Sequence, residues 1–106
     1  MSEECTLQID PEGEAKIAGP LTFDSCPGLY AAMEKRLHDG AILRRIDLGN
    51  VSNVDSAGLA LLLEWQARHS AAGNCLVIHG APSSLQRLAR LCNAMPLLGL
   101  AGREEA

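Results

Sequence analysis

The chain has 106 residues and a net charge of −4; 47% of its residues are hydrophobic and 21% are charged. These values are typical of one globular domain spanning residues 1–106, and they exclude the basic surface that nucleic-acid binding requires. No apolar run approaches the ~20 residues of a membrane span, and the acidic N-terminus is unlike a signal peptide. We therefore expect a cytoplasmic protein that does not insert into a membrane by itself.

The four cysteines are scattered through the sequence, at Cys5, Cys26, Cys75 and Cys92. They form no C-x-x-C motif and no Cys/His cluster with the spacing of a zinc site. Cys75 precedes an apolar run, and Cys92 falls on the apolar face of an expected helix. We therefore expect reduced, mostly buried thiols and neither a disulfide framework nor a bound metal.

In the first half of the chain the pattern predicts a hairpin, a helix and a strand. Residues 5–9 and 14–18 alternate loosely in polarity and flank a Pro-Glu-Gly turn, which is typical of a β-hairpin. Asp24 or Ser25 then caps a helix in which apolar residues recur at i, i+4 and i+8. Residues 42–48 follow as a strand with apolar side chains on one face.

The second half opens with a helix that begins at Asp55 or Ser56 and ends at Ala72. After it we expect a buried strand, a third helix capped by Ser83 or Ser84, a vestigial last strand and a frayed tail, with the two strands and the tail at residues 76–78, 97–100 and 101–106. The resulting order predicts an α/β fold. Its sheet is mixed and partly parallel, with four to five strands and about three helices packed on it.

The leucine-rich start of the second helix has two sides. At 100° per residue, one face is assigned to the core and carries Leu59, Leu62, Leu63 and Gln66. Leu61 then lies nearly opposite, with Trp65 on its flank. Trp is enriched among interface anchors, which favours Leu61 and Trp65 as a contact for a partner. The competing interpretation is a small tilt of the helix that buries Trp65 and leaves Leu61 alone at the surface.

Ser56 is the conspicuous hydroxyl of this helix start. Asp55 or Ser56 is expected to cap the first turn. A nucleophile needs a base, but the histidines are expected at other places in the fold and no G-x-S-x-G motif occurs. An anion site is also weak, because no Lys or Arg lies between Ile46 and Ala67 and no glycine-rich phosphate motif exists. The pattern therefore predicts no enzyme and no cofactor, and it leaves Ser56 as a recognition or phosphorylation site.

Three motifs in order resemble the STAS domain family across nearly the whole chain. They are Gly19-x-Leu21 before a helix, Ile46-Asp47-Leu48 on a strand, and Val54-Asp55-Ser56-Ala57-Gly58-Leu59 at the next helix start. The run GLALLL and the helix Leu85–Leu91 are most similar to the MlaB-type branch, the stand-alone STAS subunits of Mla phospholipid ABC transporters. Thr22 stands where many STAS domains carry Asp, a departure that affects the adjoining loop contact.

The resemblance implies two functions that share one site. In MlaB-type proteins the site binds the cytoplasmic ATPase and supports its assembly and activity, which would hold this chain at the inner membrane through its partner. In anti-sigma-factor antagonists the serine accepts phosphate from a switch kinase. The partner-binding residues are expected to be Thr22, Asp55, Ser56, Ala57, Gly58, Leu59, Leu61 and Trp65, with Ser56 as the phosphoacceptor. A weak homodimer is a further expected association.

Overall fold

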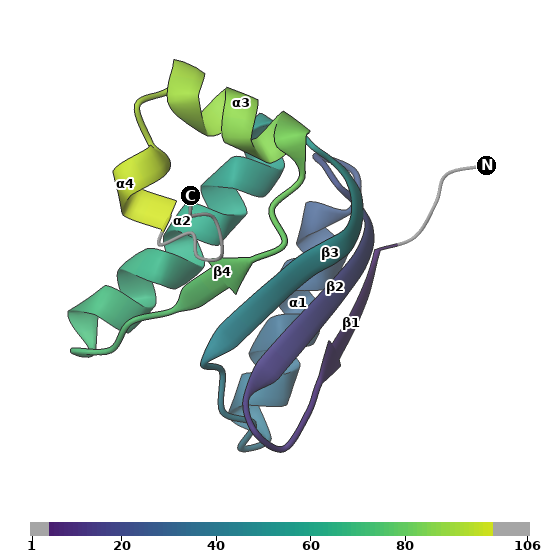
Figure 1. Ribbon diagram of the computed structural model, residues 1–106. Coiled ribbons are helices and arrows are strands. Elements are labelled where there is room, and N and C mark those ends of the chain that lie inside the picture. The colour runs from purple at the N-terminus through teal and green to yellow at the C-terminus, as the bar shows by residue number, and fades with distance from the viewer. Residues whose placement is uncertain (1–4, 99–106) are drawn as a thin grey trace.

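The computed structural model describes residues 5–98 (Figure 1). The elements, in chain order, are β1 (Thr6–Ile9), β2 (Glu14–Leu21), α1 (Cys26–His38), β3 (Arg45–Val54), α2 (Ser56–Ala71), β4 (Val77–His79), α3 (Ser83–Leu91) and α4 (Met95–Leu98). The predicted N-terminal hairpin is confirmed, as is the α/β class with four strands in the sheet. Within these residues no helix is both long and apolar enough to cross a membrane.

The four strands form one mixed sheet in the order β1-β2-β3-β4. β1 is antiparallel to β2, whereas β2, β3 and β4 run parallel to one another. Each parallel strand is followed by a helix, so α1, α2 and α3 all begin at the carboxyl edge of the parallel strands (Figure 1). The fold thus brings three helix starts together, at the edge where ligands of open α/β sheets usually bind.

Helices α1 and α2 cover one face of the sheet (Figure 1). The alternation of buried and exposed side chains along the strands explains why. Ala15 and Ile17 of β2 and Ile46 and Leu48 of β3 are at most 1% exposed and point toward the helices. Their neighbours Glu14, Lys16, Arg45 and Asp47 are half-buried or exposed on the other face. We call this second face, which no helix of the described residues covers, the open face.

Strand β3 begins and ends later than the strand predicted at 42–48. It runs from Arg45 to Val54 and pairs with β2 as far as Leu21. The segment Gly49–Asn53 is rich in polar residues, and nothing in its local preference indicates a strand. The ladder with β2 satisfies its backbone groups, and register irregularities let Val51 and Val54 face the core.

The expected last strand at 97–100 is wrong in its first half, because Met95–Leu98 form the short helix α4. Asn93, with φ of 57°, turns the chain after α3, and Pro96 is acceptable in a first helical turn. Residues 99–100 and the tail 101–106 lie outside the described part of the chain.

Gln66 joins α2 to the residue before β4 and to the end of α4. Its amide nitrogen donates to the carbonyl oxygens of Leu76 (2.7 Å) and Leu98 (2.8 Å), and its oxygen accepts from the Leu76 N–H (3.1 Å). A half-buried amide is tolerated here because its polar atoms are bonded. The expectation that Gln66 faces inward is confirmed.

The cysteines divide into two pairs rather than being mostly buried. Cys5 and Cys26 are half-buried, whereas Cys75 and Cys92 are exposed. Cys75 lies in the loop before β4, and Cys92 is the C-cap of α3, one residue beyond the amphipathic part of that helix. The expectation of burial fails at Cys75 and Cys92 because both lie just outside the regular elements whose apolar faces pack.

Candidate functional site

The candidate site lies at the carboxyl edge of β2 and β3, where the loop 22–25 meets the start of α2. The end of β2 and the start of α2 are joined by a backbone hydrogen bond, which the Asp55 N–H donates to the Leu21 carbonyl (3.3 Å). The first turn of α3 reaches the same edge, because the Ser84 hydroxyl accepts from the Val54 N–H (3.3 Å). Three helix starts therefore hold this part of the surface in place.

Asp55 is the N-cap of α2, in an extended conformation with φ of −109° and ψ of −171°. Its Oδ1 accepts from the N–H groups of Ala57 (2.9 Å) and Gly58 (3.1 Å), and its Oδ2 accepts from the N–H of Phe23 (3.0 Å). Partial burial raises the pKa of Asp55, but these backbone N–H bonds outweigh it and hold the pKa below its usual range. Asp55 is therefore an ionised structural clamp whose oxygens are occupied by the protein itself.

Ser56 follows the cap, and its side chain is exposed. Within residues 5–98 no hydrogen bond occupies its hydroxyl, because Asp55 supplies the cap. Ala57 is half-buried, and Ala60, one turn further along the same face, is exposed. The helix start thus presents a free hydroxyl among small apolar side chains.

Gly58 and Leu59, also expected to meet a partner, lie beneath the surface. A Cβ on Gly58 would collide with the carbonyl oxygen of Leu21 and would lie 2.9 Å from Val54 Cγ1. Leu59 is 4% exposed. The close approach that the glycine permits is therefore internal, between α2 and β2, so Gly58 and Leu59 shape the site from below.

Thr22 sits at the edge of the site with its side chain half-buried. Its N–H donates to the Ser25 hydroxyl oxygen (2.9 Å), and its carbonyl accepts from the Cys26 N–H (2.8 Å). The Ser25 hydroxyl donates in turn to the Pro20 carbonyl (2.7 Å). These bonds hold the loop 22–25 in shape without an acidic residue at position 22.

Leu61 and Trp65 are not at the surface, and their assignment as an exposed interface pair is wrong. Leu61 is 9% exposed and Trp65 is 1% exposed. Helix α2 is packed by α1 and β3 and also by α3 and α4 (Figure 1). Because neighbours cover it on more than one side, its buried stripe is wider than the single face assumed from the helical wheel. The competing interpretation is right that Trp65 is buried, but it is wrong that Leu61 stays at the surface.

Phe23 is the site residue that the sequence interpretation missed. Its side chain is 75% exposed, and its N–H bond to Asp55 fixes it beside the start of α2. The signal was available, because a lone Phe between polar residues after a strand has no periodic pattern to bury it. The structure therefore adds Phe23 to Thr22 and Ser56 at the surface of the candidate site. It excludes Leu61 and Trp65 from that surface because both are buried.

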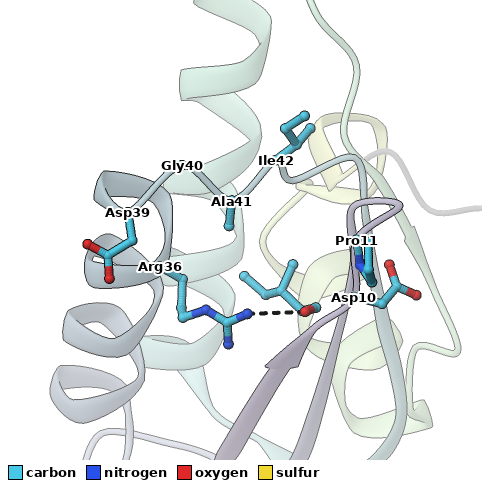
Figure 2. Close-up of a pocket in the computed structure, with 8 residues that line it drawn as sticks. Asp10, Pro11, Arg36, Asp39, Gly40, Ala41 and Ile42 are labelled. Atoms are coloured by element: carbon cyan, nitrogen blue, oxygen red, sulfur yellow. Dashed lines mark hydrogen bonds between the residues drawn. The ribbon is translucent and has the colours of Figure 1, made fainter.

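A hollow lies at the opposite edge of the parallel strands from the candidate site (Figure 2). It is lined by the β1–β2 turn and the α1–β3 loop, including Asp10, Arg36 and Ile42. The Arg36 guanidinium donates to the Ile9 carbonyl (3.1 Å) and so completes a contact within the protein. Its lining residues include the carboxylates of Asp10 and Asp39 but no Ser, Cys or His.

Comparisons with known proteins agree with this fold. A solved structure of the anti-sigma factor antagonist SpoIIAA in its unphosphorylated form is similar at a TM-score of 0.63 and 16% identity, with 82% of each chain covered. No curated protein matches the sequence. The sequence profile described as "Mlab, STAS domain" matches residues 5–99, and it indicates no enzymatic family. With nearly its whole length matched, the chain belongs to the MlaB-type STAS domain family.

Proposed function

We propose that this chain is a non-catalytic accessory subunit that binds the cytoplasmic ATPase of a Mla-type phospholipid ABC transporter and supports its assembly and activity. Contact is made through the α2 docking surface, which we define as Thr22, Phe23, Ser56, Ala57 and Ala60. In this proposal the protein is cytoplasmic and sits at the inner membrane through its partner. The family assignment and the resemblance of its leucine run to MlaB-type sequences support this class of partner.

The observation that carries the proposal is the exposed Phe23, whose backbone N–H is held by Asp55, the residue that precedes the exposed Ser56. Exposed aromatic side chains on a fixed backbone lose little conformational entropy on binding and are frequent anchors of interfaces. Ala57 and Ala60 leave room for a partner helix or loop to approach α2 closely. The five side chains of this surface carry no charge, although Asp24 and Asp55 adjoin it, which suits a partner contact of mixed apolar and hydroxyl character.

The arrangement around Ser56 also supports a non-catalytic role. His69 contacts the carbonyl oxygens of Trp65 (3.1 Å) and Leu43 (2.8 Å), and His79 lies against Glu14 (2.9 Å). Neither ring is therefore within hydrogen-bond reach of Ser56 as a general base. The Asp55 carboxylate beside Ser56 is committed to backbone N–H groups.

The test is co-purification and titration with the ABC ATPase of the source organism. Ser56→Glu adds a charge and a longer side chain at the centre of the docking surface, so we expect binding to fall by at least about tenfold, equivalent to ~1.4 kcal/mol. Ser70→Glu is the matched control, because it places the same change on an exposed residue of the same helix roughly 21 Å away at 1.5 Å per residue. Equal binding by both variants would remove Ser56 from the contact.

An anti-sigma-factor antagonist is the second candidate function, and the free, exposed hydroxyl of Ser56 favours it. Phosphate on Ser56 would add roughly −1.5 to −2 charges beside the ionised Asp55 and so expel a partner. Affinity purification followed by mass spectrometry separates the two candidates. Recovery of a switch kinase together with phosphoserine at position 56 would replace the transporter proposal, whereas an ABC ATPase with unmodified Ser56 supports it.

Self-association is the remaining proposed contact. A weak homodimer through the same surface would compete with the ATPase, because both would cover Phe23. Sedimentation across a concentration series should then show a dimer that Phe23→Ala weakens. Dimerisation that is unaffected by Phe23→Ala would place the self-contact elsewhere.

A further inference from the structure

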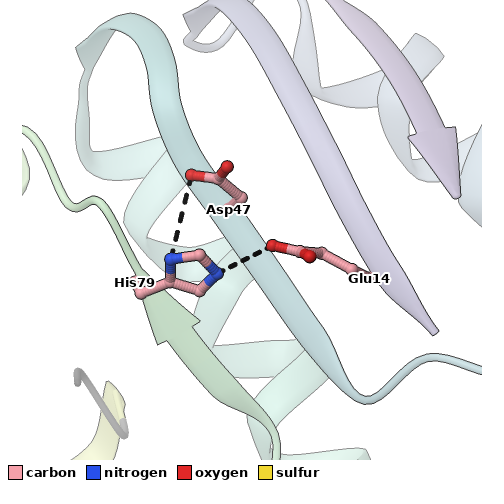
Figure 3. A group of neighbouring side chains, drawn as sticks. All are labelled: Glu14, Asp47 and His79. Carbon is pink, nitrogen blue, oxygen red and sulfur yellow. Dashed lines mark hydrogen bonds and ion pairs between the residues drawn. The ribbon is translucent and has the colours of Figure 1, made fainter. Parts of the chain in front are cut away.

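Three side chains with metal-binding chemistry converge on the open face of the sheet, away from the docking surface (Figure 3). They are Glu14 on β2, Asp47 on β3 and His79 on β4, and one ligand atom of each lies within 4.8 Å of the other two. His79 Nε2 is 2.9 Å from Glu14 Oε2, and His79 Nδ1 is 4.0 Å from Asp47 Oδ1. The imidazole therefore stands between two carboxylates.

The backbone fixes this convergence. Asp47 and His79 are direct register partners in the parallel ladder of β3 and β4, and Glu14 pairs with Arg45, two residues before Asp47 on the same face. The Gly49 N–H donates to Asp47 Oδ1 (2.8 Å) and holds that carboxylate in place. Gly80 leaves space next to it, since a Cβ there would lie 2.9 Å from the same oxygen. A site built on strands keeps its ligand atoms in position better than one built on loops.

The charge of the cluster is only partly balanced. Arg45 reaches Glu14 at 3.8 Å, but its side chain is 52% exposed, so solvent screens this pair. Among residues 5–98, His79 at 4.0 Å is the sole ion-pair partner of Asp47. Two carboxylates and one imidazole thus share the open face with two exposed cations, Arg45 and Lys16. Lys16 is the β2 register partner of Asp47 but makes no ion pair with it among the described residues.

We propose that Glu14, Asp47 and His79 form a binding site for a divalent transition-metal ion of the Zn²⁺ class. One imidazole nitrogen and two carboxylate oxygens are ligands that Zn²⁺ accepts at 2.0 to 2.2 Å. The two carboxylates now face different ring nitrogens of His79, so side-chain rotation must bring the ligand atoms, which lie within 4.8 Å of one another, onto one ion. The three side chains are partly exposed, so water would complete the coordination.

Metal binding would have a structural consequence at the edge of the sheet. β4 has three residues and pairs with β3 over three register positions. A metal ion held by β2, β3 and β4 ties this short edge strand across the sheet. Binding to the folded state alone stabilises it by RT ln(1 + L/Kd), where L is the free metal concentration, so the thermal midpoint rises with that concentration.

The test is calorimetric titration of the tag-free chain with ZnCl₂. Cys75→Ser and Cys92→Ser are introduced first, because exposed thiols are competing soft ligands for Zn²⁺. Cys5 and Cys26 compete less, since burial raises the pKa of both thiols. We expect one equivalent of Zn²⁺ to bind and the thermal midpoint to rise.

His79→Ala should reduce the affinity for Zn²⁺ by more than about tenfold, because loss of even an outer-shell partner costs that much. His38→Ala is the matched control, since His38 is an exposed histidine at the end of α1, and it should leave the affinity unchanged. If His79→Ala perturbs folding, Asp47→Asn serves as the second test. It preserves side-chain shape and should also weaken the binding of Zn²⁺. Absence of binding, or equal binding by the parent and by both cluster variants, would overturn the proposal.

Discussion

The Asp55 carboxylate accepts a hydrogen bond of 3.0 Å from the N–H of Phe23, a residue 32 positions earlier in the chain. This contact joins the loop after β2 to the N-terminus of α2, and the same carboxylate caps the helix through Ala57 and Gly58. One side chain thus stabilises α2 and positions the exposed aromatic beside Ser56. The motif aspartate has a structural role, because its carboxylate oxygens are taken by backbone N–H groups.

Asp55→Ala removes both the cap and the tether to Phe23. We expect the free energy of unfolding to fall by about 1–2 kcal/mol, the range measured for lost N-caps. Asp24→Ala, an exposed residue of the same loop, should change stability by less than about 0.5 kcal/mol. Urea denaturation followed by circular dichroism measures both, and equal effects of the two variants would contradict the role given to Asp55.

Stability should fall in acid in a way that depends on Asp55. Backbone N–H groups hold the pKa of Asp55 below its ordinary value, and they do the same for the pKa of Asp10 in the β1–β2 turn. A lowered folded-state pKa contributes stability that is complete above the unfolded value of about 3.9 and is lost as pH falls through the folded value. Denaturation midpoints between about pH 6 and pH 2 should show a shallower acid loss in Asp55→Ala than in the parent.

Gly58→Ala should destabilise the protein by about 1–3 kcal/mol, because the new methyl group would meet Leu21 and Val54. Gly28→Ala is a matched control in α1. A Cβ there meets nothing within 4 Å, so this variant should gain about 0.4–1 kcal/mol from reduced freedom of the unfolded chain. Thermal denaturation of both variants measures these changes in stability. An unchanged stability of Gly58→Ala would contradict the close contact between α2 and β2.

Phe23 and Trp65 should respond oppositely to truncation. Trp65→Ala opens a cavity in the core and should cost about 3–5 kcal/mol of stability. Phe23→Ala should leave stability within about 0.5 kcal/mol, because its ring is exposed, while weakening ATPase binding by roughly tenfold. Tryptophan fluorescence gives an independent check, since a buried Trp65 should resist quenching by acrylamide in the free protein.

The thiols should label in two classes. Cys75 and Cys92 are exposed, whereas burial, with a smaller contribution from Asp55, raises the pKa of Cys26 to about 11. Burial also raises the pKa of Cys5. A thiol reacts as the thiolate, so a maleimide at neutral pH should modify Cys75 and Cys92 first. Mass spectrometry of the intact and digested protein measures the order, and early labelling of Cys26 would contradict it.

The local sequence predicted α1, α2 and α3 because their signals are local, but it missed the short helix α4. Asp55 before an apolar run gives the start of α2, and Gly73, with φ of 80°, follows its end. The hairpin also follows from a short turn between two alternating segments, and the order of elements leads to a mixed sheet. These features depend on neighbours within a few residues, so they could be read without the fold.

What the sequence alone determined is therefore the α/β order of elements, the family motifs and the position of Ser56 at a helix start. The tertiary structure decided which side chains reach the surface there. Trp65 is buried because α2 is packed on several sides, whereas the backbone of the exposed Phe23 is held at the start of α2 because Asp55 binds its N–H across 32 positions. Glu14, Asp47 and His79 likewise meet only because strands distant in sequence pair in this register. Helical periodicity describes one element at a time. The burial of a side chain depends on how many elements surround its helix, and the meeting of distant side chains depends on how strands pair.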